Sequence, residues 1–207
     1  MISADVKAKE LSFMESWWRE RTLAAGGSPS ALGALRGVLV YEDKLTREWA
    51  VETWDQVGVV AGRGNLETSS WQVGQLSQPQ TLSEAVQKSA VADVVLVALR
   101  AAEQLPIPFY VWVDAWLPRR VAGQGALVGL ILSSSELAGA SRQVEDYLRA
   151  VAGRARMEFT ARQRQLDLEL DAAYGEDLAR RATLVTPLLG QILDQRPSPY
   201  QHWGINE

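Results

Sequence analysis

Short apolar runs alternate with amphipathic stretches through the middle of the chain. Apolar runs lie at 35–41, 94–99, 107–113 and 126–132, and a weaker one lies at 68–73. Most of them are separated by stretches with helical spacing, as in 44–62, where Ala50, Trp54 and Val57 share one face. Strands that are apolar nearly throughout are typical of a parallel sheet covered on both faces. The pattern therefore predicts an α/β fold with a doubly wound, five-stranded parallel sheet flanked by helices.

One connection fits this pattern poorly. Only the residues RAAEQLP, at 100–106, separate the apolar run that ends at Leu99 from the run that begins at Ile107. A crossover between parallel strands usually takes about ten or more residues. The prediction that 107–113 is a strand is therefore the least supported part of the assignment.

Helical patterns also flank the predicted sheet. We expect a helix at 3–24, with Trp17 and Trp18 on its apolar stripe, followed by a linker that contains Pro29. Beyond 157 the spacing of Leu166 and Leu170 favours a helix, although the alternation of leucine and acidic residues at 166–171 also fits a strand. The predicted organisation is an N-terminal arm and linker (1–32), an α/β domain (33–157) and a C-terminal helical arm with an extended tail (158–207).

Composition excludes several classes of function. The chain has 207 residues, no cysteine and one histidine, His202, so it has neither a thiolate nucleophile nor a multi-histidine metal site. A net charge of −4 argues against nucleic acid as a partner. No apolar run approaches the roughly 18 residues of a membrane span, and the absence of cysteine fits a reducing cytoplasm.

Three stretches carry a resemblance to a known family. VLVYED (38–43) is a short strand that ends in the acidic pair Glu42 and Asp43, ADVVLVAL (92–99) matches a third strand, and GALVGLIL (125–132) lies where a fifth strand is expected. In this respect the chain resembles the receiver domains of bacterial response regulators. The resemblance implies a flavodoxin-like sheet of order 2-1-3-4-5 and an acidic pair that holds Mg²⁺. Other stretches, including the terminal HWGINE, resemble a small bacterial family that brings no known activity with it.

The chain departs from the receiver pattern where the chemistry of that family takes place. The residue at the phosphoacceptor position is Ala98, not aspartate, and the hydroxyl position at the end of the expected fourth strand holds Val113, followed by Asp114. The last lysine in the chain is Lys88, so none lies near the expected fifth strand. Phosphoryl transfer to a carboxylate needs the carboxylate, a metal and a cation. A receiver-like fold with these residues is expected not to be phosphorylated in the usual way.

The acidic residues at expected strand ends are candidate ligands. Because the carboxyl ends of parallel strands meet at one edge, Glu42, Asp43 and Asp114 are predicted to share a crevice there, where they could hold a divalent cation such as Mg²⁺. Two other interpretations stay open. The first two acids cap the next helix, or repulsion among the three acids recruits an arginine such as Arg100, Arg119 or Arg120, with Asp114 in an ion pair that fixes its loop.

Tryptophan and arginine residues outside the expected core are candidates for protein contacts. Trp17 and Trp18 lie on the predicted N-terminal helix, and Trp116, Arg119 and Arg120 are expected in a loop. The sequence thus favours a non-catalytic, receiver-like interaction module, a regulatory adaptor or an assembly subunit that binds a protein partner or itself. The alternative is an α/β protein, with or without enzymatic activity, that binds a small ligand or divalent metal in the acidic crevice.

Overall fold

Strands and helices alternate along the chain. The computed structural model describes residues 13, 15–23, 34–61, 66–120, 125–133 and 138–165, which all belong to one unit spanning residues 1–165. In chain order its elements are β1 (Leu35–Tyr41), α2 (Lys44–Ala61), β2 (Leu66–Gln72), the 3-10 helix η2 (Val73–Ser77), α3 (Pro79–Ala90), β3 (Val94–Arg100), α4 (Ile107–Trp116), the 3-10 helix η3 (Leu117–Arg119), β4 (Ala126–Ser133), α5 (Ala138–Ala155) and β5 (Glu158–Gln165).

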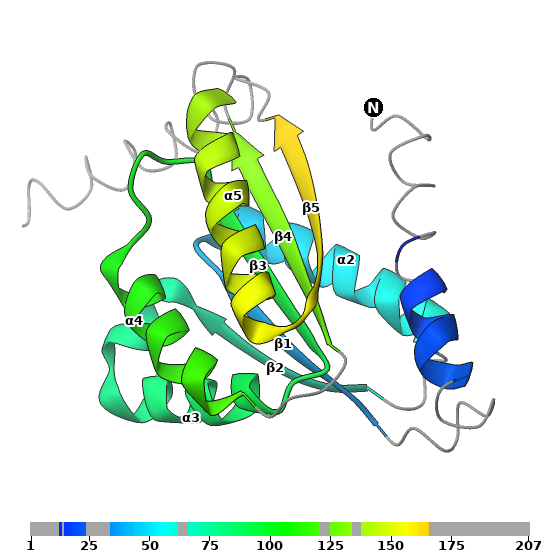
Figure 1. Cartoon of the computed structure of the whole chain (residues 1–207). Helices are drawn as coiled ribbons and strands as arrows, with labels where there is room; N and C mark the ends of the chain where they lie inside the picture. Colours follow the sequence, from blue (N-terminus) through cyan, green and yellow to red (C-terminus); the bar gives the residue numbers. More distant parts are fainter. Residues whose placement is uncertain are drawn as a thin grey trace, which may run out of the picture. The chain divides into compact units, whose positions relative to one another are not determined.

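The five strands form one parallel sheet in the order β2-β1-β3-β4-β5, with β3 at its centre (Figure 1). The predicted fold class and strand order are therefore confirmed. Residues 15–23 are helical, as predicted for the N-terminal arm. The predicted linker before residue 33 and most of the predicted C-terminal arm, with His202, lie outside the described residues.

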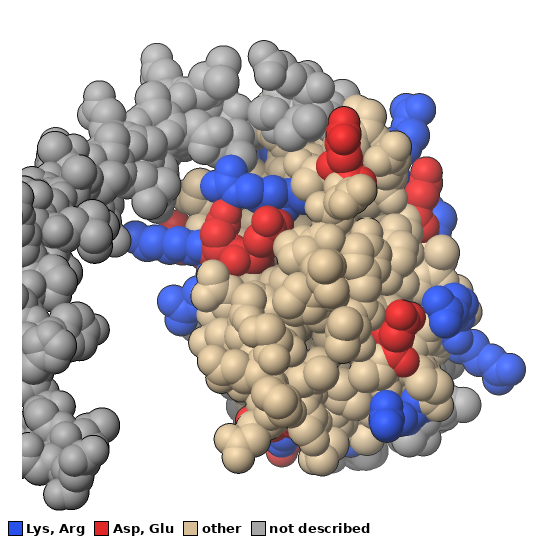
Figure 2. Space-filling model, turned by 90° about the vertical axis from the view of Figure 1, so that its left-hand side faces the viewer, with Lys and Arg blue, Asp and Glu red and all other residues tan. Residues whose placement is uncertain are grey.

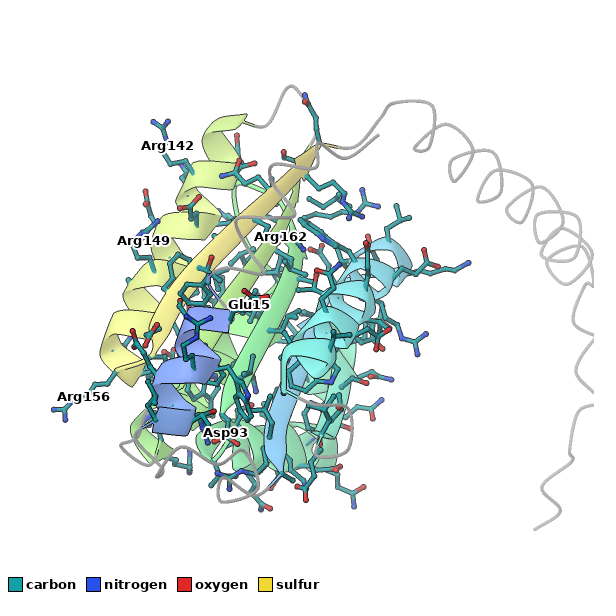
Figure 3. The ribbon with its side chains drawn as sticks, turned by 90° about the vertical axis from the view of Figure 1, so that its right-hand side faces the viewer. Glu15, Asp93, Arg142, Arg149, Arg156 and Arg162 are labelled. Carbon is teal, nitrogen blue, oxygen red and sulfur yellow. The ribbon has the colours of Figure 1, made fainter. Side chains whose placement is uncertain are left out.

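Each face of the sheet has its own apolar core, because side chains of a strand alternate between the faces. Val95, Val97 and Leu99 of β3 belong to the large core that also includes residues of α3, α4 and α5. The other residues of β3, such as Leu96, face α2, which packs against β1, β3 and β4. Figure 3 shows the two layers on either side of the sheet, with α5 to the left of β5 and α2 to the right.

Two elements differ from the sequence prediction, and α4 is the more consequential. Residues 107–113 were predicted to be a strand because nearly every residue is apolar, but they belong to a helix that spans 107–116. Its buried residues are Phe109, Trp112, Val113 and Trp116, a spacing of three and four that places them on one helical face. The prediction is wrong because apolar residues also occupy the outer face and hide this period. The short link between Arg100 and Ile107, which is too short for a usual crossover between parallel strands, therefore connects β3 to helix α4.

The second difference is β5. The sequence predicted that the chain turns helical after residue 157, but 158–165 form the strand next to β4, so the α/β domain extends to at least residue 165. The residues EFTARQRQ are mostly polar because β5 is an edge strand whose side chains are only partly covered. In consequence, β4 rather than 107–113 is the fourth strand, and it ends at Ser133.

A buried carboxylate joins the N-terminal helical segment to the sheet. Asp93 precedes β3, and its side chain is 7% exposed. One oxygen accepts a hydrogen bond from Arg21 Nη2 at 2.6 Å, and the other accepts one from the Arg36 N–H at 2.9 Å. Burial by itself would raise the pKa of Asp93, but the hydrogen bonds from Arg36 and Arg21 outweigh burial and hold that pKa below its ordinary value.

The Asp93→Asn variant should lose about 2–4 kcal/mol of unfolding free energy, because it leaves two arginines beside an uncharged amide. Because folding lowers the pKa of Asp93, its carboxylate stabilises the wild-type protein at pH values above the ordinary carboxyl pKa. This stabilisation is lost as the pH falls through the pKa of Asp93 in the folded state. Urea unfolding of both proteins at several acidic pH values measures this. Their stabilities should converge toward the acid end.

The exposed Asp55 on α2 offers the matched control, since Asp55→Asn removes the same charge from the surface. It should change stability by less than about 0.5 kcal/mol. Equal losses in the two variants at neutral pH would show that the arginine pairs of Asp93 contribute nothing specific.

Candidate functional site

An ion pair joins the ends of β1 and β3 at the carboxyl end of the sheet. These strands flank the point where the strand order reverses, which is where doubly wound sheets bind ligands. Asp43 forms a salt bridge with Arg100 Nε, and the Arg100 N–H donates to Glu42 Oε2 at 2.8 Å. Both predicted acids therefore use Arg100 as a partner, so the interpretation that the acids recruit Arg100 is confirmed for this pair.

Asp43 also caps the next helix. Its Oδ1 accepts a hydrogen bond from the Thr46 N–H at 2.9 Å, and the Thr46 hydroxyl accepts one from the Asp43 N–H at 2.8 Å. This reciprocal pair satisfies donors at the start of α2, which would otherwise lack partners. The interpretation that the acidic pair caps the helix is thus also confirmed for Asp43.

The two acids differ in their electrostatics. Burial alone would raise the pKa of Asp43, but the Thr46 N–H and the Arg100 guanidinium outweigh it and lower that pKa. Burial raises the pKa of Glu42; the Arg100 N–H opposes the rise, and the Asp43 carboxylate adds to it. Asp43 is therefore held as a carboxylate by its partners, whereas Glu42 is the acid of the pair that accepts a proton more readily.

Ala98 lies inside the sheet. It pairs with Tyr41 of β1 and is fully buried, and its carbonyl accepts a hydrogen bond from the Glu42 N–H at 3.1 Å. The methyl group points to the face that α2 covers, by the alternation of β3. The nearest residue of β3 on that same face toward the carboxyl end is Arg100. A guanidinium thus extends from the end of this strand, and it already pairs with Asp43.

Asp114 and Val113 do not lie where they were predicted. Both belong to α4: Val113 faces the core and Asp114 is exposed. The expectation that Asp114 follows a strand is wrong because 107–116 is helical. Within the described residues, no group of three or more histidine or acidic side chains has an arrangement that could hold a metal ion. The structure therefore does not bring Asp114 together with Glu42 and Asp43.

The residues predicted to make protein contacts are mostly covered. Trp116 was expected in a loop, but it ends α4 and is fully buried, and Trp17 is only 3% exposed. Arg120 is half-buried and donates to the carbonyls of Ala92 at 2.8 Å and Ser89 at 3.3 Å. Trp116 is thus unavailable as a surface anchor, because helix α4 turns it into the core. Trp18 is partly exposed, and Arg119, which donates to the Ala115 carbonyl, is exposed.

The outer face of α4 carries two exposed apolar side chains that the sequence pattern did not predict, with the exposed Asp114 one turn further along the same face. Ile107 is 77% exposed and Val111 is 46% exposed, and their spacing of four residues places them side by side on one helical face. Figure 2, which views the side where α3 and α4 lie, shows a broad uncharged area with few acidic or basic side chains. The sequence could have indicated this face, because 107–117 contain more apolar residues than the buried face of one helix needs.

Comparisons with known proteins leave the family open. No protein-family model matches the chain, and no curated protein matches it. One solved structure that resembles it is the flavodoxin of Streptococcus pneumonia TIGR4, with 11% identity over 63% of this chain and 83% of that one and a TM-score of 0.43. The fold assignment rests on the strand order of this chain itself. No helix among the described residues is long and apolar enough to cross a membrane.

We predict that Arg100→Met lowers stability by about 0.5–1 kcal/mol, since the ion pair with Asp43 is about one-third exposed. Removing the guanidinium also leaves two acids near each other, so Mg²⁺ should raise the melting temperature of Arg100→Met more than that of the wild type. Thermal unfolding with and without millimolar Mg²⁺ measures both effects.

The double variant Arg100→Met/Asp43→Asn is the control, because it removes one of the two acids again. Its melting temperature should not respond to Mg²⁺. A large Mg²⁺ effect in the wild-type protein that disappears in Asp43→Asn would contradict the prediction, since the cation would then displace Arg100.

Proposed function

We propose that this protein is a non-catalytic, receiver-like interaction module that acts by binding a partner protein. The observation that carries the proposal is the closed carboxyl end of the sheet, where Arg100 pairs with Asp43 and binds Glu42 through its N–H. An acidic pair that already has a cation is poorly suited to recruit a metal ion. The fully buried Ala98 offers no carboxylate that could accept a phosphoryl group.

The outer face of α4 supplies the contact surface in this proposal. Exposed isoleucine and valine side chains on a helix cost free energy in water, and contiguous apolar surface commonly marks a protein interface. On the opposite face of α4, Phe109 and Trp112 are fully buried, so the helix packs on the core and turns Ile107 and Val111 outward. We infer that a partner with an apolar surface of its own covers this face, in a regulatory adaptor or an assembly.

The chemical half of the proposal can be tested with a small phosphoryl donor. Incubation with acetyl phosphate and Mg²⁺ should leave the intact mass of the wild-type protein unchanged. A receiver domain with its aspartate intact serves as the positive control for the reagents. A phosphoryl adduct on the wild-type protein that Asp43→Asn or Glu42→Gln removes would contradict the proposal.

The contact half can be tested with charge substitutions on α4. Ile107→Asp/Val111→Asp should abolish capture of a partner from extracts of the native organism, because it places charges in the apolar interface. Val59→Asp is the matched control: Val59 is 57% exposed on α2, on the other side of the sheet. Partner capture quantified by mass spectrometry should be lost for the α4 variant and retained for Val59→Asp. Equal capture of the partner by the wild-type protein and by both variants would contradict the proposal that the outer face of α4 binds it.

A further inference from the structure

The uncharged surface around α4 is wider than one helix. η2 and α3 pack against α4, on the side of the molecule that Figure 2 shows. The sequence has no acidic or basic residue at 68–83 or at 104–113, so charge is missing from η2, from the start of α3 and from most of α4. Charged residues are depleted at the centre of protein interfaces and return at the rim. This side therefore has the charge pattern of an interface, with Ile107 and Val111 as its exposed apolar side chains.

Charges of opposite sign stand at the two ends of α4. Glu103 precedes the helix, Arg119 follows it, and both are exposed. Arg119 donates to the Ala115 carbonyl, and neither residue forms a salt bridge within the described part of the chain. The ten residues of α4 span about 15 Å, so the two charges cannot pair within one copy. They are available for a pair between two molecules.

The positions of these two charges are symmetric about Val111. Glu103 lies eight residues before Val111, and Arg119 lies eight residues after it. When two identical helices pack antiparallel about a two-fold axis at one residue, positions equally far from that residue in opposite directions face each other. Each Glu103 would then meet the Arg119 of the other copy, and the two Val111 side chains would meet on the axis. The face is complementary to itself.

Asp114 also has a suitable counterpart in this arrangement. It is exposed, and it has no salt bridge among the described residues. Asp114 lies three residues after Val111, so it would face Pro108 in the first turn of the other α4. That turn has no acidic residue, and within the described residues no side chain caps it. A carboxylate is favourable beside the positive end of a helix dipole, so the self-contact provides Asp114 with an attractive partner.

We propose that this side of the protein binds a second copy of the chain, with α4 antiparallel to α4 about a two-fold axis at Val111. The proposal rests on the contact surface proposed above and specifies what occupies it. A second copy supplies the complementary charges by symmetry, whereas another protein would need the same arrangement by coincidence. Because a standard interface buries roughly 800 Å² on each copy, the contact is expected to extend from α4 onto η2 and α3.

Sedimentation velocity of the full-length protein over a range of concentrations tests the dimer. The wild type should form a dimer as its concentration rises, and Ile107→Asp/Val111→Asp should stay monomeric, because it places like charges in the contact. Val59→Asp, on the exposed side of α2, is the matched control and should dimerise as the wild type does. Circular dichroism checks that each variant is folded. A wild type that stays monomeric at every concentration, or a folded α4 variant that still dimerises, would overturn the proposal.

Charge reversal tests the position of the axis. Glu103→Arg alone and Arg119→Glu alone each place like charges at both end contacts, and each should weaken dimerisation roughly tenfold. An equimolar mixture of the two variants should regain wild-type dimerisation, because the mixed dimer pairs opposite charges at both contacts. Glu48→Arg, on the exposed side of α2, is the control and should dimerise as the wild type does. A mixture that dimerises no better than its components would show that the axis does not pass through Val111.

A single introduced thiol tests the same axis without changing any charge. The chain has no cysteine, so Val111→Cys carries one thiol per copy, and the two thiols meet on the proposed axis. Mild oxidation should convert this variant rapidly into a disulfide-linked dimer, since Cβ atoms about 4 Å apart suit a disulfide. Val59→Cys is the control and should cross-link slowly, by random collision. Equal cross-linking rates of the two variants would refute the proposed packing.

Failure of this proposal can be told apart from failure of the proposed function. If the wild type is monomeric but Ile107→Asp/Val111→Asp loses a different protein from extracts, the second copy is refuted and the contact surface is retained. If the wild type is monomeric and capture from extracts is also unaffected by the α4 variant, both proposals are wrong. A wild-type dimer that the α4 variant abolishes supports both.

Discussion

The requirement to cover both faces of the central strand organises this structure. Residues Val94–Leu99 of β3 are fully or almost fully buried, so water must be excluded from both sides of the sheet. Helices α3, α4 and α5 cover one face and α2 covers much of the other. A sheet buried on both sides can meet solvent only at its two edges and at the two ends of its strands. The sheet itself can therefore contribute to binding or chemistry only at those places.

Ion pairs lie near both ends of β3. At the amino end Asp93 binds Arg21 and Arg36, and at the carboxyl end Asp43 pairs with Arg100. Each carboxylate already binds groups within the protein. Asp93 joins the N-terminal helical segment to the sheet, and Asp43 joins the start of α2 to the end of β3. Exposed apolar side chains lie instead on the outer face of α4.

The sequence predictions failed at α4 and β5, where apolar residues do not follow the usual pattern of a half-buried helix or a fully buried strand. In α4, apolar residues occupy the exposed face as well as the buried one, so Ile107 and Val111 masked the helical spacing of Phe109, Trp112 and Trp116. In β5, the edge position allows polar side chains on both faces, so Arg162 and Arg164 concealed a strand. The count of five strands was nevertheless right, because one false strand replaced one missed strand. That exchange displaced Val113 and Asp114 from the predicted site.

The sequence by itself determined which chemistry is missing: Ala98 cannot accept a phosphoryl group, and no lysine follows Lys88. Its alternation of apolar and amphipathic runs predicted the parallel α/β fold, and its residues show the acidic pair after the first strand, whereas the order 2-1-3-4-5 was implied by the resemblance to receiver domains. Only the tertiary structure decided that Arg100 lies beside Asp43, that Trp116 is buried and that 158–165 form a strand next to β4. Those facts depend on strand register and helix packing between residues far apart in the chain, and no local pattern encodes them.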